Sequence, residues 1–332
     1  MACYHPLYAM VTGLTDKGKK AIRIYSAIEL PNFKRAHPEI KEWLTIPCGK
    51  CIGCRLDYSR EWATRCMLEA KQYEHNQFIT LTYDNDNLIT NTGTDSVTGE
   101  VTEYATLVPD DLAKFIKDLR RYFEYHYNHT GIRFYACGEY GEKYQRPHYH
   151  LILFNLPLPD KVPFFKNSNG DQIYTSDIIQ TIWNRGLTSV GEVTWNSAAY
   201  TARYVMKKVK GPTAKEWYSA RNILPEFVRM SRKPGIAFGY YEENKYKIYE
   251  NDEIILTNKK GKGEVVKPSK YFDRLFDLDS PEAMQAIKKK RQEMAINAMD
   301  CQLANTSLNK EEYLKLKENN KEESIKRLKR VI

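Results

Sequence analysis

The sequence lacks any apolar run of the roughly 18 residues that a membrane-spanning helix needs, so we expect no membrane contact. Its first ten residues also lack a charged segment followed by an apolar one, which argues against a secretory signal peptide. No internal repeat is evident. We therefore expect a protein of the cytoplasm, where cysteine thiols stay reduced.

An ATP-binding loop is missing as well. Residues 13–20 come close to a phosphate-binding loop, but Lys20 stands where that motif needs a serine or threonine to meet Mg²⁺. No apolar strand of the usual length precedes this segment. Without an ATPase motor, the protein would depend on a separate helicase for any strand separation.

Basic residues outnumber acidic ones, 51 to 42, which gives a formal net charge of +9. Such a balance favours a polyanionic partner, above all nucleic acid, although a merely basic soluble protein has the same composition. Hydrophobic residues make up 42% of the chain and aromatic residues 12%, so a folded core can form.

The periodicity of apolar residues predicts an α+β fold. Helices and strands alternate, and two strands follow each other closely enough to form a hairpin, so we expect a central antiparallel sheet with helices covering one face. A charged helical segment begins near residue 281. The predicted helices cover residues 56–73, 109–130, 176–183 and 196–209, and the predicted strands cover 78–83, 132–137, 148–154 and 187–195.

A His-x-His pair lies in the third predicted strand. Because alternate residues of a strand point to one face, His148 and His150 can present two imidazoles to one ion. If the two central strands pair as a hairpin, Glu139 lies opposite His148. Mixed nitrogen and oxygen ligands suit Mg²⁺ or Mn²⁺ acting as a Lewis acid on a phosphate. The alternative is two strand histidines with unrelated roles.

Two tyrosines lie on the last predicted helix. Tyr200 and Tyr204 are four residues apart and share a face, and Lys207 follows Tyr204 by one turn. A cation beside a phenol favours the phenolate, so these residues are candidates for nucleophilic catalysis. Core packing is the alternative, since the chain holds 24 tyrosines.

Three cysteines follow the pattern C-x₂-C-x₂-C at Cys48, Cys51 and Cys54. Closely spaced thiols in a reducing compartment indicate a structural zinc site, which needs a fourth ligand. Cys3 is our first candidate, and Cys66 and His5 are alternatives. The competing interpretation is a set of buried free thiols.

Over residues 3–210 the sequence resembles the gokushovirus (Microviridae) replication initiation proteins of the HUH endonuclease superfamily. The superfamily's ordered motifs resemble the strand that starts at Phe78, then the His pair, then the tyrosine helix. The closer likeness rests on four stretches, Cys3-Tyr4-His5-Pro6, Pro47-Cys48-Gly49-Lys50-Cys51-Ile52-Gly53-Cys54-Arg55, Gly138-Glu139-Tyr140-Gly141 and Arg146-Pro147-His148-Tyr149-His150.

The resemblance implies an RRM-like HUH fold and a rolling-circle replication initiator. A metal on the His pair and Glu139 would polarise the phosphate while one tyrosine attacks, forming a 5′-phosphotyrosine adduct. The second tyrosine would then help to rejoin the unit-length single-stranded circle. Implied partners are viral single-stranded and replicative-form DNA and the host's helicase and polymerase, in the bacterial cytoplasm.

We expect three parts in this chain: a cysteine-rich segment and helix (1–75), a nicking domain (76–212), and a C-terminal region with a charged helical tail (213–332). Two other functions remain open. One is an HUH relaxase or transposase, although in many relaxases the tyrosine precedes the His pair. The other is a non-catalytic, zinc-containing DNA-binding protein.

Overall fold

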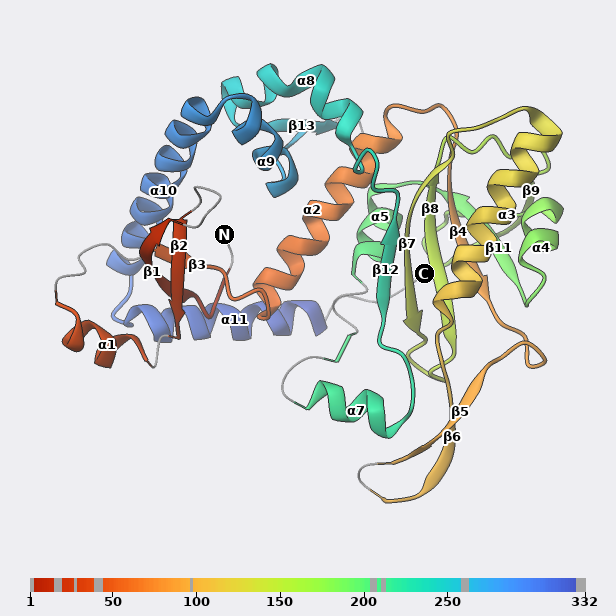
Figure 1. The fold of residues 1–332 in the computed structure, drawn as a ribbon, viewed down its shortest axis with the longest axis horizontal. Helices are drawn as coiled ribbons and strands as arrows, with labels where there is room; N and C mark the ends of the chain where they lie inside the picture. Colours follow the sequence, from red (N-terminus) through yellow and green to blue (C-terminus); the bar gives the residue numbers. More distant parts are fainter. Residues whose placement is uncertain are drawn as a thin grey trace. The chain divides into compact units, whose positions relative to one another are not determined.

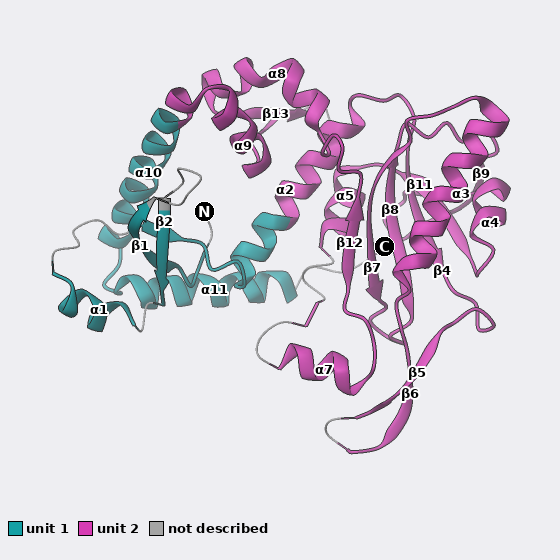
Figure 2. Ribbon diagram, viewed as in Figure 1, with its two compact units in different colours: residues 1–58, 285–330 teal, residues 59–284, 331–332 magenta. Residues whose placement is uncertain are grey.

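A computed structural model describes residues 3–14, 20–26, 29–38, 44–95, 98–203, 208–209, 213–257 and 263–326 (Figure 1). The chain forms two compact units (Figure 2). One combines residues 1–58 with 285–330, and the other combines residues 59–284 with 331–332. Within the described ranges, no helix is both long and apolar enough to cross a membrane.

The larger unit contains a seven-stranded antiparallel sheet in the order β12-β7-β8-β4-β11-β10-β9. The succession β4-α3-β7-β8-α4-β11 is the β-α-β-β-α-β order of the split βαβ motif. The predicted α+β class with an antiparallel sheet is confirmed. The strands are β4 (Asn76–Thr82), β7 (Arg133–Tyr140), β8 (Pro147–Phe154), β9 (Val162–Lys166), β10 (Gln172–Thr175), β11 (Thr188–Glu192) and β12 (Phe227–Met230).

Helices cover both faces of this sheet, so the expectation of a single covered face was wrong. Helices α3 (Pro109–Tyr127) and α4 (Asp177–Trp183) pack on one face, where Leu151 is buried. Helices α2 (Ile52–Ala70) and α5 (Trp195–Ala202) pack on the other, where Ile152 is buried. The physical reason is the apolar run at the end of β8, whose alternate side chains both need cover.

Helix α3 shows why these elements form where they do. Pro109 occupies its first turn, followed by acidic residues that favour a helix N-terminus, and a stripe of apolar side chains turns inward. The helix ends at Asn128, which adopts a left-handed conformation (φ 47°), three residues before the predicted stop at Gly131. The buried stripe is Leu112, Phe115, Ile116, Leu119 and Phe123.

Helix α5 is shorter than predicted. A capping box formed by Thr194 and Ser197 starts it, and it ends at Ala202. Lys208 and Val209 are not helical, because the Val209 amide donates a hydrogen bond to the Tyr218 hydroxyl (2.9 Å), a partner outside any helix. Tertiary contacts therefore replace the predicted helix end. Tyr204 and Lys207 lie outside the described residues.

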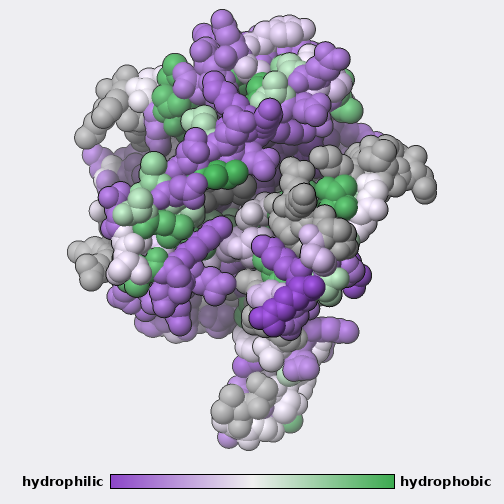
Figure 3. Space-filling view, turned by 90° about the vertical axis from the view of Figure 1, so that its left-hand side faces the viewer, coloured by the Kyte–Doolittle hydropathy of each residue, from purple (hydrophilic) through white to green (hydrophobic). Residues whose placement is uncertain are grey.

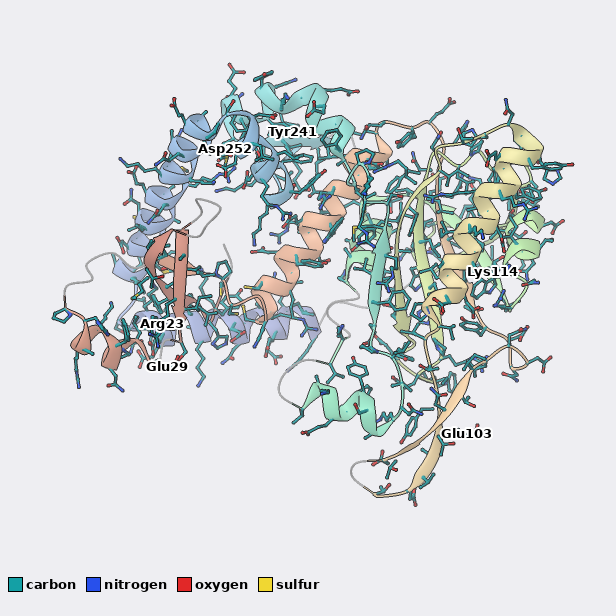
Figure 4. All side chains as sticks on the ribbon, in the orientation of Figure 1. Arg23, Glu29, Glu103, Lys114, Tyr241 and Asp252 are labelled. Carbon is teal, nitrogen blue, oxygen red and sulfur yellow. The ribbon has the colours of Figure 1, made fainter. Side chains whose placement is uncertain are left out.

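The rest of the larger unit joins the sheet through buried polar contacts. Glu69 accepts from the Arg133 guanidinium and from the Ala237 amide, and Arg65 donates to the Ile236 carbonyl at 2.9 Å. Tyr241, labelled in Figure 4, donates to Asp279 at 2.9 Å. The remaining elements are β5 (Thr90–Thr94), β6 (Val101–Ala105), α7 (Ala214–Ala220), α8 (Phe238–Asn251), β13 (Ile254–Thr257), β14 (Gly263–Val266) and α9 (Lys270–Asp279).

The smaller unit contains a three-stranded sheet in the order β2-β1-β3. The charged segment after residue 281 is helical, and most of its side chains are exposed. The face drawn in Figure 3 is mostly hydrophilic, with separate small hydrophobic patches. The elements are β1 (Leu7–Leu14), β2 (Lys20–Tyr25), α1 (Leu30–Ala36), β3 (Leu44–Ile46), α10 (Pro281–Ala304) and α11 (Lys310–Lys326).

The two compact units divide the chain near residues 58 and 284. The functional division near residues 75 and 212 stays a prediction.

Candidate functional site

The register of the β7–β8 hairpin places a carboxylate beside the His pair. Glu139 lies opposite His148, as the spacing predicted, and Cys137 lies opposite His150. On the other side of β8, Thr80 of β4 is the partner of His150. Since paired residues of neighbouring strands point to the same face, these side chains gather on the face that α5 covers.

Three ligand atoms converge there. The Nε2 atom of His148 lies 3.1 Å from Oε1 of Glu139, and Nε2 of His150 lies 3.4 Å from the same oxygen. All three candidate ligand atoms lie within 4.8 Å of one another. Glu139 is only 1% exposed, so its negative charge needs a compensating positive charge.

Hydrogen bonds behind the imidazoles orient both rings. Nδ1 of His148 lies 3.1 Å from the Arg146 carbonyl oxygen. That oxygen can only accept, so Nδ1 carries the proton and the neutral ring turns its Nε2 lone pair toward Glu139. Nδ1 of His150 meets the Thr80 hydroxyl at 3.0 Å. Such outer contacts are typical of metal-binding histidines.

This donor set fits a divalent cation. An imidazole lone pair and a carboxylate oxygen repel each other at 3.1 Å unless a proton or a cation lies between them. Two nitrogens and one carboxylate oxygen are also ligands that Mg²⁺ or Mn²⁺ can accept with further positions left open. His148, His150 and Glu139 would therefore hold the ion.

Tyr200 reaches this group from α5. Its hydroxyl donates a hydrogen bond to Oε1 of Glu139 at 2.9 Å, and its ring meets the His150 ring edge-on, with centroids 4.9 Å apart. Burial raises the pKa of the Tyr200 phenol well above its usual value, and the Glu139 carboxylate raises it further. A cation held beside Glu139 would shift this pKa in the opposite direction.

The structure thus brings together four of the predicted residues: Glu139, His148, His150 and Tyr200. Tyr204 and Lys207 lie outside the described residues. Thr80 was not singled out from the sequence. The signal was present, because Thr80 alternates with apolar residues in the predicted strand, but its pairing with His150 depends on a strand contact 70 residues away.

Comparisons with known proteins show what this chain is related to. Residues 76–209 match the model of a family described as replication-associated protein ORF2. The chain is 38% identical over 298 residues to the replication-associated protein ORF2 of Spiroplasma virus 4, covering 89% of this chain and 87% of that protein. The chain belongs to this family of phage replication-associated proteins.

Two further relatives carry similar names. The replication-associated protein VP4 of Bdellovibrio phage phiMH2K is 29% identical over 259 residues, covering 75% of this chain and 74% of that protein. The replication-associated protein ORF4 of Chlamydia phage 1 is 35% identical over 194 residues, covering 57% and 44%. No solved structure matches this family member. The resemblance inferred from the sequence is confirmed by these relatives.

The replication-associated protein has a second candidate metal site, in its smaller unit. The sulfur atoms of Cys3, Cys48, Cys51 and Cys54 lie within 4.8 Å of one another, and none forms a disulfide. Cys66, an alternative ligand, is instead buried between α2 and the large sheet.

Backbone amides point at the sulfur atoms of this cysteine cluster. The amide of Cys48 donates to Sγ of Cys3 (3.2 Å), and the amide of Cys51 donates to Sγ of Cys48 (3.3 Å). Such bonds stabilise thiolates. Burial nevertheless raises the pKa of the Cys3 thiol to about 11. Four sulfurs that accept hydrogen bonds but resist ionisation by themselves fit a Zn²⁺ ion, which binds thiolates in a tetrahedron.

Proposed function

We propose that this phage replication-associated protein is an endonuclease that initiates rolling-circle replication. One observation carries the proposal: the Tyr200 hydroxyl lies 2.9 Å from the Glu139 oxygen that also faces both imidazoles of the His pair. A nucleophile, two neutral imidazoles and a carboxylate therefore share one partly buried space. The β-α-β-β-α-β order of the sheet supports assignment to the HUH type.

In this mechanism, His148, His150 and Glu139 hold Mg²⁺ or Mn²⁺, which supplies Lewis-acid polarisation of the scissile phosphate. The Tyr200 oxygen attacks phosphorus and forms a P–O bond, while the bond from phosphorus to the 3′ oxygen breaks. The phenol proton leaves along its hydrogen bond to Glu139, and the departing oxygen takes up a proton to become a free 3′-hydroxyl.

The product is a 5′-phosphotyrosine that retains the energy of the broken phosphodiester bond. A later attack by a 3′-hydroxyl on this adduct restores the phosphodiester and frees the tyrosine, so joining the unit-length circle needs no ATP. We assign the second cut to Tyr204 and phosphate contact to Lys207. Both assignments rest on the sequence alone.

The partners follow from this activity. The substrates are viral single-stranded and replicative-form DNA, and the host supplies the helicase and polymerase in its cytoplasm. A relaxase or transposase of the same superfamily shares the chemistry, but here the tyrosines follow the His pair. A non-catalytic DNA-binding protein gives no reason for the Tyr200 hydroxyl to meet Glu139.

The deciding experiment mixes the protein with its own single-stranded genome and Mn²⁺ and runs a denaturing gel. We expect a shifted covalent band that is lost with EDTA, with His148→Ala, and with Tyr200→Phe and Tyr204→Phe combined. The single phenylalanine variants show which tyrosine leads. If folded, DNA-binding protein gives no adduct with any genomic fragment, the nuclease is rejected in favour of the binding protein.

We also propose that the cysteine cluster holds a structural zinc ion. Zinc in purified protein should approach one ion per chain and fall sharply in Cys48→Ser. Cys301→Ser is the matched control, since Cys301 is exposed and lies outside the cluster. A folded protein free of zinc would reject this proposal.

A further inference from the structure

Large apolar side chains are exposed on the outermost strand of the seven-stranded sheet. In β9, Val162 is 58% exposed, Phe164 is 68% exposed and Phe165 is 49% exposed. Soluble proteins rarely gather aromatic side chains in water without a use for them. These residues lie at the edge of the sheet whose middle strands carry Glu139 and the His pair.

Strand registers show that Phe165 shares the sheet face of the His pair. Phe165 is the partner of Ile173 in β10. A β-carbon added at Gly191 of β11 would lie 3.7 Å from the Ile173 side chain and 3.5 Å from the Phe78 ring, so these three residues adjoin on one face. The Phe78 ring in turn stacks on the His150 ring, with centroids 5.7 Å apart and planes within 6°.

An apolar row therefore crosses the sheet from the edge to the candidate metal site. It runs Phe165, Ile173, Gly191, Phe78 and then His150. Four strand-to-strand steps separate β9 from β8, which corresponds to about 19 Å at the usual spacing of strands. The row is long enough for several nucleotides, and Gly191 leaves no side chain between Ile173 and Phe78.

We propose that this row binds unpaired bases of the DNA strand that enters the metal site, with Phe165 and Phe164 as stacking residues. The inference rests on the proposed function, which places the scissile phosphate beside His150. Aromatic rings bind bases of any sequence, because every base has a flat π-face, and such stacking is typical of proteins that bind single strands. The net charge of +9 attracts the phosphate backbone.

The edge position of β9 otherwise suggests strand pairing with a second copy. Pro163, in the middle of β9, has no amide hydrogen to donate and interrupts such pairing. Unpaired bases, which need ring faces and not backbone donors, fit this strand better.

The test measures the fluorescence anisotropy of a labelled single-stranded oligonucleotide in EDTA, so that no cleavage intervenes. We expect Phe164→Ala combined with Phe165→Ala to weaken binding by about 5- to 150-fold, the range for loss of one stacked base. Phe165→Trp should retain wild-type affinity. Tyr125→Ala is the matched control, since Tyr125 is 83% exposed and belongs to α3, on the opposite face.

Two further arms identify what the row contacts. Binding of a blunt duplex, whose bases are already stacked, should not change in the double alanine variant. An oligonucleotide with one abasic position at the stacked site should bind wild type and Phe165→Ala equally, because the mutation then removes nothing more. Equal affinity of wild type and the double variant for intact single strands overturns the inference, as does an equal loss for duplex.

The inference and the nicking proposal fail separately. A wild-type protein that never forms an adduct but loses single-strand affinity on Phe164→Ala and Phe165→Ala refutes the nuclease and leaves the base-binding row standing. An adduct that forms normally while these variants bind like wild type refutes only the row. If the variants instead convert a dimer to a monomer in sedimentation, the row is an interface between copies and the inference is wrong.

Discussion

Glu139 and His148 face each other across the β7–β8 ladder, with the carboxylate Oε1 atom 3.1 Å from the imidazole Nε2 atom. Eight residues separate them in the chain, and the short connection between the strands leaves little freedom in the register. The Arg146 carbonyl at the end of that connection holds Nδ1 of His148. One hairpin therefore positions two of the three proposed metal ligands and orients one of them.

Glu139→Gln tests the carboxylate. The amide keeps the shape of the side chain and can still accept the Tyr200 hydrogen bond, but it lacks the negative charge that attracts a cation. We expect the Mn²⁺ concentration for half-maximal adduct formation to rise at least about 10-fold, since even outer contacts of metal ligands are worth that much. Glu124→Gln, on the exposed side of α3, is the control and should leave the titration unchanged.

Tyr200→Phe tests the nucleophile. The phenyl ring keeps its contact with His150, so the fold should survive, whereas the attacking oxygen is gone. We expect adduct through this position to be abolished, and peptide mapping by mass spectrometry should assign any remaining adduct to Tyr204. Tyr144→Phe, at a side chain that is 72% exposed, should behave like wild type. Wild-type adduct mapped only to other tyrosines would contradict the role of Tyr200.

Gly186 lets the chain pass the end of β4 closely. Its φ of 152° is unfavourable for other residues, and an added β-carbon would lie 2.4 Å from the Thr82 carbonyl oxygen and 2.5 Å from the Asp84 amide nitrogen. We expect Gly186→Ala to lower the free energy of unfolding by about 3 kcal/mol, measured by denaturant titration.

Gly170→Ala is the matched control for Gly186→Ala. Gly170 has a φ of +81° but open space around an added β-carbon, so only backbone strain of about 1 kcal/mol should be lost. Similar losses at the two positions would show that the close approach to β4 is not the cause.

Asp279 gives a pH dependence of stability. The hydrogen bond from the Lys245 ammonium, with a second from the Tyr241 hydroxyl, lowers the pKa of Asp279 below its usual value of 3.8. A carboxyl whose pKa is lowered by folding stabilises the protein above 3.8, and this contribution disappears as the pH falls through the lowered value.

We therefore expect Asp279→Asn to unfold at a lower temperature than wild type at pH 7, by ~1 kcal/mol or less because the pair is exposed to solvent. The two melting temperatures should converge in acid. Added salt should also narrow the difference at neutral pH. A difference in melting temperature that stays constant from pH 7 to acid would contradict the assignment to charge.

Local features of the sequence determined much of this protein. The alternation of apolar residues predicted strands β4, β7 and β8, and the stripe from Leu112 to Phe123 predicted helix α3. The pairing of Glu139 with His148 also followed, because a short connection between two strands restricts their register. Each of these depends on neighbours within about twenty residues, whose periodicity the sequence displays directly.

Contacts between distant parts of the chain were decided only by the tertiary structure. The Tyr200 hydroxyl meets Glu139 across 61 residues, and Sγ of Cys3 meets the Cys48 amide across 45. The early end of α5 follows from tertiary contacts in the same way, since a residue of another element supplies the partner of Val209. Such contacts form because burial and hydrogen bonding in the folded chain outweigh local preference, and no local pattern of residues reveals which distant partner each group will find.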